Sequence, residues 1–229
     1  MNKISIENIP AVIWGEPSNS IYIYVHGKLS SKEEASGFSQ IAARKGCQVL
    51  SFDLPEHGER ENEKTPCTVW NGVRDLGIVG KYARENWNDI CLYGSSLGAY
   101  FSLLAYKDLP LRKCLFLSPV LDMVRLIQNM MKQASISEQD LMEKRDVLTP
   151  AGETLNWDYY CYVKENPVDR WDASTAILYG SEDDVTEPEV AEGFTKRWGC
   201  DLTVLEGGGH WFHTERELAL LDTWLIRHI

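Results

Sequence analysis

The chain of 229 residues is 44% hydrophobic and 25% charged, which is ordinary for a folded globular protein and excludes a wholly disordered one. Its length suits one α/β domain, or one such domain with a small insertion. The formal net charge is −11, and so acidic a surface repels phosphate backbones and anionic lipids. We therefore expect neither nucleic acid nor a membrane surface as a partner.

No stretch of the sequence reaches the ~20 apolar residues that span a bilayer. The first residues also lack the charged-then-apolar layout of a signal peptide. The six cysteines are scattered without a C-x-x-C pair, a spacing that fits neither a disulfide framework nor a zinc site. A reducing, cytoplasmic compartment is the simplest expectation.

Short apolar runs, bounded by Gly, Pro, Asp or Ser, predict strands that are buried on both faces. They are Ile21–Val25, Val49–Phe52, Ile90–Tyr93, Cys114–Leu117, Ala176–Tyr179 and Leu202–Leu205. The stretch Ile4–Trp14 can supply one or two further strands at an edge of the sheet.

Amphipathic segments between these runs predict helices. Three of the helices are preceded by the pattern of a capping box, in which Ser or Thr is followed three residues later by Glu. These pairs are Ser30 with Glu33, Thr186 with Glu189, and Thr214 with Glu217. Strands that alternate with helices in this way predict an α/β fold, with a mostly parallel central sheet and helices on both faces.

The segment from about residue 121 to residue 170 breaks the alternation. It contains four of the five methionines and ends in an aromatic cluster of one Trp and three Tyr. We interpret residues 1–229 as a single domain and this segment as an inserted cap rather than as a second independent domain.

The strongest local motif is the G-x-S-x-G pattern of Gly94–Gly98, which lies between a predicted strand and a predicted helix. A serine on a sharp strand-to-helix turn is exposed for attack, and the helix start offers the N–H of Leu97 to an oxyanion. The simpler interpretation of the pentapeptide alone is a tight turn without a catalytic role.

A serine nucleophile needs a base, and the base needs an acid that orients it. Asp183 follows the strand Ala176–Tyr179, and His210 follows the strand Leu202–Leu205 and three glycines. Either residue alone is explained as an ordinary loop residue. Because Ser96, Asp183 and His210 all follow strands in the order that a triad requires, we predict a Ser-His-Asp triad. Asp184 and Asp122 are the alternative acids.

Four motifs together resemble the α/β-hydrolase family across nearly the whole chain. They are Tyr24–Gly27, the turn Phe52–Gly58, the elbow Gly94–Gly98, and the acid and histidine loops Gly180–Asp183 and Gly209-His210. Within this family the chain is most similar to the small serine hydrolases grouped with monoglyceride lipases, S33-type serine peptidases and cinnamoyl esterases.

The resemblance implies a role for each residue. Ser96 is the nucleophile, His210 the general base and then acid, and Asp183 the residue that orients His210. The backbone N–H groups of Leu97 and Lys28 form the oxyanion hole. The turn departs from the family at Glu56, where a glycine is usual.

The resemblance also implies loop-bracing roles for His26 and His57. It further implies that the cap shapes the substrate pocket. Its Met and aromatic side chains can form an adaptable apolar wall, or can simply join the cap to the core. The candidate substrate contacts are Met123, Met130, Trp157, Tyr160 and Trp211.

The expected function is a serine hydrolase that cleaves small-molecule carboxylic esters of small or medium acyl groups through an acyl-enzyme. No H-E-x-x-H motif and no G-x-G-x-x-G after a strand occurs, so we expect neither a metal nor a cofactor. The alternatives are an amide or peptide hydrolase, a thioesterase, and a catalytically silent binding module. The oligomeric state is left open.

Overall fold

The central feature of the computed structural model, which describes residues 1–229, is an eight-stranded sheet of order β1-β2-β4-β3-β5-β6-β9-β10. The strands are β1 (Asn2–Ile6), β2 (Ile9–Trp14), β3 (Ser20–Val25), β4 (Gln48–Phe52), β5 (Asp89–Ser95), β6 (Lys113–Leu117), β9 (Thr175–Gly180) and β10 (Asp201–Leu205). Strand β2 pairs antiparallel with β1 and β4, and every other pair is parallel. The predicted mostly parallel sheet is confirmed.

The apolar runs form strands because they are buried on both faces, as in β4 and β9, where every residue is buried. Strand β10 differs from this expectation. It lies at the edge of the sheet, and its Val204 is 43% exposed.

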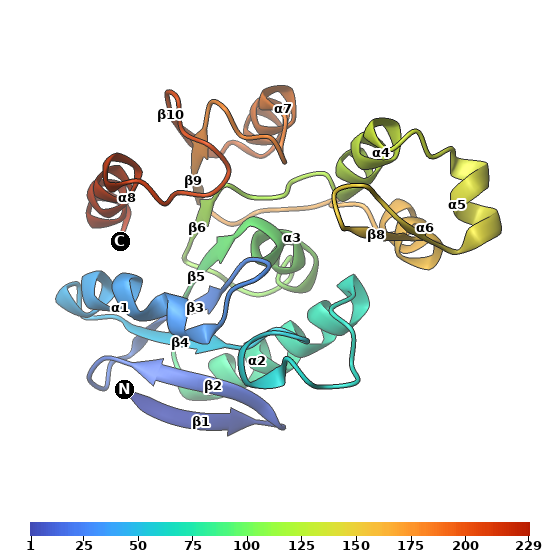
Figure 1. Ribbon diagram of the computed structural model, residues 1–229. Coiled ribbons are helices and arrows are strands. Elements are labelled where there is room, and N and C mark those ends of the chain that lie inside the picture. Colours follow the sequence, from blue (N-terminus) through green and yellow to red (C-terminus); the bar gives the residue numbers. More distant parts are fainter. The chain divides into compact units, whose positions relative to one another are not determined.

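Helices cover both faces of the sheet (Figure 1). Helices α1 (Ala35–Arg44) and α8 (Glu215–His228) pack on one face, where Phe38 and Trp224 join the same apolar core. Helices α2 (Val69–Asn86) and α3 (Ser96–Ala105) pack against each other on the opposite face, and α7 (Pro188–Trp198) packs beside β10. Two short 3₁₀ turns are η1 (Lys32–Glu34) and η2 (Gly58–Arg60).

Only one of the three predicted capping boxes forms. Thr214 and Glu217 make both capping-box hydrogen bonds at the start of α8, as predicted. The prediction for Ser30 is wrong, because the first turn is η1 and α1 begins only at Ala35, without a side-chain cap. The prediction for Thr186 is also wrong, because its hydroxyl donates to the carbonyl of Pro119 and α7 begins behind Glu187.

The chain divides into two compact units, one of Met1–Leu121 with Arg170–Ile229 and one of Asp122–Asp169. The second unit contains α4 (Met123–Gln133), α5 (Glu138–Lys144), the antiparallel pair β7 (Asp146–Leu148) and β8 (Thr154–Asn156), and α6 (Trp157–Glu165). That this unit acts as a cap stays a prediction. No helix has both the length and the apolar composition that a bilayer crossing needs.

The two glycines Gly72 and Gly77 of α2 test how closely this helix packs on α3. A Cβ at Gly72 would lie 2.5 Å from the buried ring of Phe101, whereas a Cβ at Gly77 would meet no atom within 4 Å. We expect Gly72→Ala to lower the free energy of unfolding by about 1–3 kcal/mol through overpacking. Gly77→Ala should raise it by about 1 kcal/mol, because alanine favours a helix interior. Urea unfolding measures both variants, and equal effects would contradict the described packing.

Candidate active site

The carboxyl ends of β3 and β5 meet at the point where the winding of the sheet reverses. Strand β3 pairs with β4 on one side and with β5 on the other, so the loops that follow β3 and β5 diverge there. Such a switch point leaves a crevice that binds ligands in open α/β sheets. Ser96 follows β5 and Gly27 follows β3, so both lie at this crevice.

The turn from β5 into α3 holds Ser96 in strained backbone. Its φ is +47°, in the left-handed region that a serine rarely adopts. The two glycines of the motif allow close backbone contacts around the turn. A Cβ at Gly98 would lie 2.3 Å from the carbonyl oxygen of His26, and one at Gly94 would lie 2.9 Å from the Cα of Ala99. The motif therefore brings the start of α3 against the end of β3.

Three side chains from separate loops form one hydrogen-bonded row. The Ser96 hydroxyl lies 2.8 Å from Nε2 of His210, and Nδ1 of His210 lies 2.8 Å from Oδ2 of Asp183. Because a carboxylate only accepts hydrogen bonds, Nδ1 carries the imidazole proton and Nε2 is left to accept the proton of Ser96. This is the arrangement that a serine needs to become a nucleophile.

Asp183 is fixed independently of the histidine. Its side chain is fully buried, and its Oδ1 accepts the backbone N–H groups of Val185 at 2.9 Å and of Thr186 at 2.8 Å. The neighbouring Asp184 is exposed. Asp122 caps α4 instead, where its Oδ1 accepts the N–H of Arg125. Of the three carboxylates, Asp183 is the one that contacts His210.

The loop that carries His210 is held from both sides. A Cβ at Gly180 would lie 2.3 Å from the carbonyl oxygen of Gly208, so the acid loop and the histidine loop touch through their backbones. Glu217 accepts the N–H of Gly209 with one oxygen at 3.3 Å, and the N–H of His213 with the other at 3.1 Å. The cap of α8 thus also fixes the residues around His210. The sequence pattern predicts the capping box but not this second contact.

The backbone near Ser96 provides two candidate oxyanion donors. The N–H of Leu97 lies in the first turn of α3, where a helix has no acceptor of its own for its N–H groups. The second donor is the N–H of Lys28, which directly follows Gly27. Gly27 lies so near Ser96 that a Cβ on it would be 3.4 Å from the Cβ of the serine. The loop after β3 therefore passes beside the serine.

Two histidines brace this loop. Buried His26 accepts the N–H of Leu54 at Nε2, while its Nδ1 donates to the carbonyl of Gly27 at 2.7 Å. Burial lowers the pKa of His26 to about 4, so its ring is neutral at pH 7 and suits this pattern. His57 accepts the N–H of Leu29 at Nε2. Glu56 adopts φ +62°, so a turn with a left-handed residue forms there although the residue is not glycine.

The five candidate substrate contacts lie in different units. Trp211 directly follows His210 and is 75% exposed. Met123, Met130, Trp157 and Tyr160 belong to the unit Asp122–Asp169. Tyr160 is buried, and its hydroxyl donates to Glu138 of the same unit. A substrate contact by any of the five stays a prediction.

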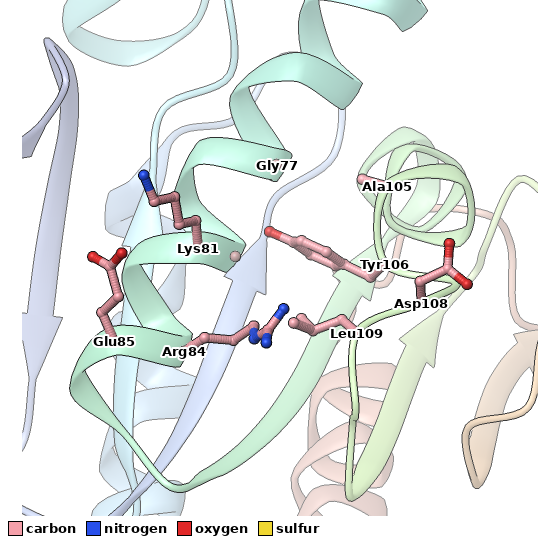
Figure 2. Close-up of a pocket in the computed structure, with 9 residues that line it drawn as sticks. Gly77, Lys81, Arg84, Glu85, Ala105, Tyr106, Asp108 and Leu109 are labelled. Carbon is pink, nitrogen blue, oxygen red and sulfur yellow. The ribbon is translucent and has the colours of Figure 1, made fainter.

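A cavity of about 500 Å³ lies between α2 and the residues that follow α3 (Figure 2). Tyr106 and Leu109 form one wall, and the side chain of Arg84 points toward Leu109 from the other. None of the residues that line it belongs to the row of Ser96, His210 and Asp183. No group of three or more His, Cys, Asp or Glu side chains is arranged to hold a metal ion.

The model of the alpha/beta hydrolase family matches residues 23–223 of this chain. No curated protein is significantly similar to it in sequence. Est1E from Butyrivibrio proteoclasticus, in a structure with bound ferulic acid, is 18% identical over 99% of this chain and 97% of its own, with a TM-score of 0.77.

Two further structures are similar over similar lengths. A monoacylglycerol lipase of Paleococcus ferrophilus is 17% identical over 96% of this chain and 99% of its own, with a TM-score of 0.67. XC6422 from Xanthomonas campestris is described as an α/β serine hydrolase without a lid. It is 16% identical over 99% of this chain and 92% of its own, with a TM-score of 0.67. At such low identities these similarities establish the fold.

Glu217 gives a pH-dependent test of the histidine loop. The N–H of Thr214, its hydroxyl and the N–H of His213 lower the pKa of Glu217 from 4.5 to about 2. Since the folded-state pKa is lowered, the stabilisation is complete above pH 4.5 and is lost as the pH falls toward 2. We expect Glu217→Gln to lower the free energy of unfolding by about 1–3 kcal/mol at pH 7.

Urea unfolding across this pH range measures the difference between Glu217→Gln and the unsubstituted protein, which should shrink in acid. Glu215→Gln, at an exposed position in the same helical turn, is the matched control and should differ little from the unsubstituted protein at any pH. A deficit for Glu217→Gln that is the same at neutral and acid pH would contradict the assignment.

Proposed function

The chain belongs to the alpha/beta hydrolase family, and from that premise we propose that it is a serine hydrolase that cleaves carboxylic esters of small or medium acyl groups. The observation that carries the proposal is the hydrogen-bonded row from the Ser96 hydroxyl through His210 to buried Asp183. A chain that only binds a ligand has no need of a strained serine aligned with an oriented imidazole.

In the proposed reaction, the Ser96 oxygen attacks the ester carbonyl while Nε2 of His210 takes its proton. Asp183 stabilises the imidazolium, and two backbone N–H donors already fix Asp183 in place. The N–H groups of Leu97 and Lys28 stabilise the negative oxygen of the tetrahedral intermediate. When the intermediate collapses, His210 gives its proton to the leaving alcohol and the acyl group stays on Ser96.

The second half of the reaction repeats the proton transfer with water. His210 takes a proton from a water molecule, whose oxygen attacks the acyl-enzyme. The proton then returns to the Ser96 oxygen as the carboxylic acid leaves. All proton transfers use His210, and the protein needs no group beyond its own side chains and backbone.

The similar structures support an ester as the substrate. A monoacylglycerol lipase acts on an ester of glycerol, and Est1E binds ferulic acid, which is the kind of carboxylic acid that an ester releases. We infer the ester class from these two similarities, and the proposal is narrower than what family membership establishes.

Two exposed apolar side chains beside the site favour a hydrocarbon substituent on the ester. Leu29, in the loop with Lys28, is 92% exposed although its φ of +61° is costly for leucine. Trp211 is held by its ring stacking on His213 at a centroid distance of 5.0 Å. Exposed apolar groups in strained or fixed conformations suit contact with a ligand rather than stability of the fold.

A fluorophosphonate probe tests the nucleophile. The Ser96 oxygen should displace fluoride from phosphorus, and mass spectrometry should find the adduct on Ser96. Ser96→Ala should remove the adduct and lower kcat for 4-nitrophenyl butyrate by about 10⁴-fold or more. Ser95→Ala is the matched control because it changes the adjacent serine, and it should keep the adduct. Folded protein without a Ser96-dependent adduct would overturn the proposal.

The preference for esters is tested on matched substrates. We expect kcat/KM for a butyryl ester to exceed that for the butyryl thioester and the butyryl anilide with comparable leaving groups. Faster cleavage of the anilide would replace the ester proposal with an amide or peptide hydrolase, and faster cleavage of the thioester with a thioesterase.

The role of Trp211 is tested with nitrophenyl esters of increasing acyl length. Loss of contact with about two methylene groups corresponds to about tenfold in rate. Trp211→Ala should therefore lower the octanoate-to-acetate ratio of kcat/KM by about tenfold. Ile226→Ala, which removes an exposed apolar side chain from α8, should leave the ratio unchanged. An unchanged ratio in Trp211→Ala would exclude an acyl contact by the indole.

A further inference from the structure

Three of the attachments of the loop after β3, residues 26–32, lead to the same neighbouring segment. At its start His26 accepts the N–H of Leu54 at 3.1 Å. In its middle the N–H of Leu29 donates to His57 at 3.1 Å. At its end Lys32 binds Asp53. Since all three partners lie in residues 53–57, this turn acts as a template for the loop that carries the N–H of Lys28.

The third attachment is a buried ion pair. Lys32 and Asp53 have exposed side-chain fractions of 1% and 0%. The backbone N–H of Lys32 donates to Oδ1 of Asp53 at 2.8 Å, and its Nζ donates to Oδ2 at 2.7 Å. One carboxylate thus holds both the backbone and the side chain of Lys32, so the position and the direction of the chain are both fixed there.

The ammonium of Lys32 has further partners that keep it charged. Its Nζ lies 3.0 Å from Glu59 and 3.1 Å from Glu33. Burial alone lowers the pKa of Lys32, but its hydrogen bonds to Asp53, Glu59 and Glu33 outweigh burial and raise the pKa above its usual range. Lys32 therefore keeps its positive charge although it is buried.

Further hydrogen bonds and a close backbone contact hold Asp53 in place. Its Oδ2 also accepts the N–H of Glu59 at 3.0 Å, and its carbonyl accepts from Arg60 at 3.0 Å. Arg60 is in turn paired with buried Asp75 of α2 at 2.8 Å. A Cβ at Gly58 would lie 2.2 Å from Oδ1 of Asp53, so the turn packs its backbone directly on the carboxylate.

A buried ion pair is a poor device for stability alone. The cost of removing both charges from water often equals the gain from their attraction, and an apolar pair of the same volume can be as stable. What such a pair adds is direction, since hydrogen bonds constrain geometry and apolar contacts do not. Because the pair lies at the end of the loop that carries Lys28, it constrains the geometry of this loop.

We propose that Lys32 is a positioning residue, which acts through Asp53 to hold the N–H of Lys28 in the direction of the oxyanion. The inference rests on the proposed function, because an oxyanion forms only if Ser96 attacks a carbonyl. Lys32 does not touch the reacting atoms. It restricts the set of conformations that the loop between Gly27 and Lys32 can adopt.

Lys32→Met tests the proposal, since it keeps the length of the side chain and removes the charge. Loss of one oxyanion donor costs about 10²–10³ in kcat, and a donor that is only misdirected should cost less. We expect kcat for 4-nitrophenyl butyrate to fall by about 10- to 100-fold, with KM changed by less than about threefold. The assay is run well below the measured melting temperature of each variant.

Gln48→Met is the matched control. Gln48 is buried at the other end of β4, and its side-chain oxygen accepts from Trp87 at 2.9 Å, so the variant loses a buried polar partner far along the same strand. It should lower the melting temperature but leave kcat unchanged. Asp53→Asn supplies a second variant should Lys32→Met fail to fold. It keeps the shape of the carboxylate, weakens the same contacts, and should lower kcat with little change in KM.

The outcomes separate the two proposals. A loss of kcat in Lys32→Met or Asp53→Asn that Gln48→Met does not share supports the positioning role. Unchanged kcat in a folded Lys32 or Asp53 variant, or an equal loss in Gln48→Met, overturns it and leaves the hydrolase proposal intact. Unsubstituted protein without Ser96-dependent hydrolysis overturns both.

Discussion

The close approach of two backbone segments beyond β3 and β5 is the constraint on which the site depends. The start of α3 lies so near the end of β3 that a Cβ at Gly98 would sit 2.3 Å from the carbonyl oxygen of His26. The loop of Gly27 also passes beside Ser96, whose φ of +47° lies in the left-handed region. A larger residue at Gly98 would push these segments apart, and would move Ser96 away from the N–H of Lys28.

A second backbone contact joins the other half of the site. The acid loop and the histidine loop touch at Gly180 and Gly208, and Glu217 ties the histidine loop to α8. Buried Asp183 has its remaining oxygen occupied by the N–H groups of Val185 and Thr186. The imidazole of His210 is thus oriented by a carboxylate that its other hydrogen bonds hold in one orientation. In an active site, groups that are already held in place can stabilise a charge that develops during the reaction, because they do not have to reorganise.

The strands of the sheet and the position of Ser96 follow from patterns that are local in sequence. Each apolar run and the G-x-S-x-G motif lie within the segment whose structure they predict, so the strands and the position of Ser96 could be predicted. That Thr186 does not cap α7 could not be predicted, because the competing partner of its hydroxyl is distant. The hydroxyl of Thr186 donates to Pro119, which lies 67 residues away. The spacing favours Asp183 but keeps the adjacent Asp184 as an alternative, since only the folded turn decides which carboxylate faces inward.

Lys32 shows more clearly what could not be predicted from the sequence. A lysine beside two glutamates has the pattern of a solvated surface turn, and no sequence rule predicts that it is buried against Asp53, 21 residues away. Glu56 is the opposite case. It departs from the glycine that the family resemblance leads one to expect, yet it adopts the left-handed conformation, and its carboxylate accepts the N–H of Cys67 at 2.6 Å. Tertiary contacts determine the burial of Lys32 and the backbone conformation of Glu56.

The proposed chemistry depends most directly on one proton, which lies on Nδ1 of His210 and points at Asp183. Proton NMR detects such an imidazole proton as a far-downfield resonance, because the hydrogen bond deshields it and protects it from exchange. We expect this resonance in the unsubstituted protein and in Asp184→Asn, and its loss or a large shift in Asp183→Asn. A resonance that is unchanged in Asp183→Asn, or lost only in Asp184→Asn, would contradict the assignment of Asp183 as the residue that orients His210.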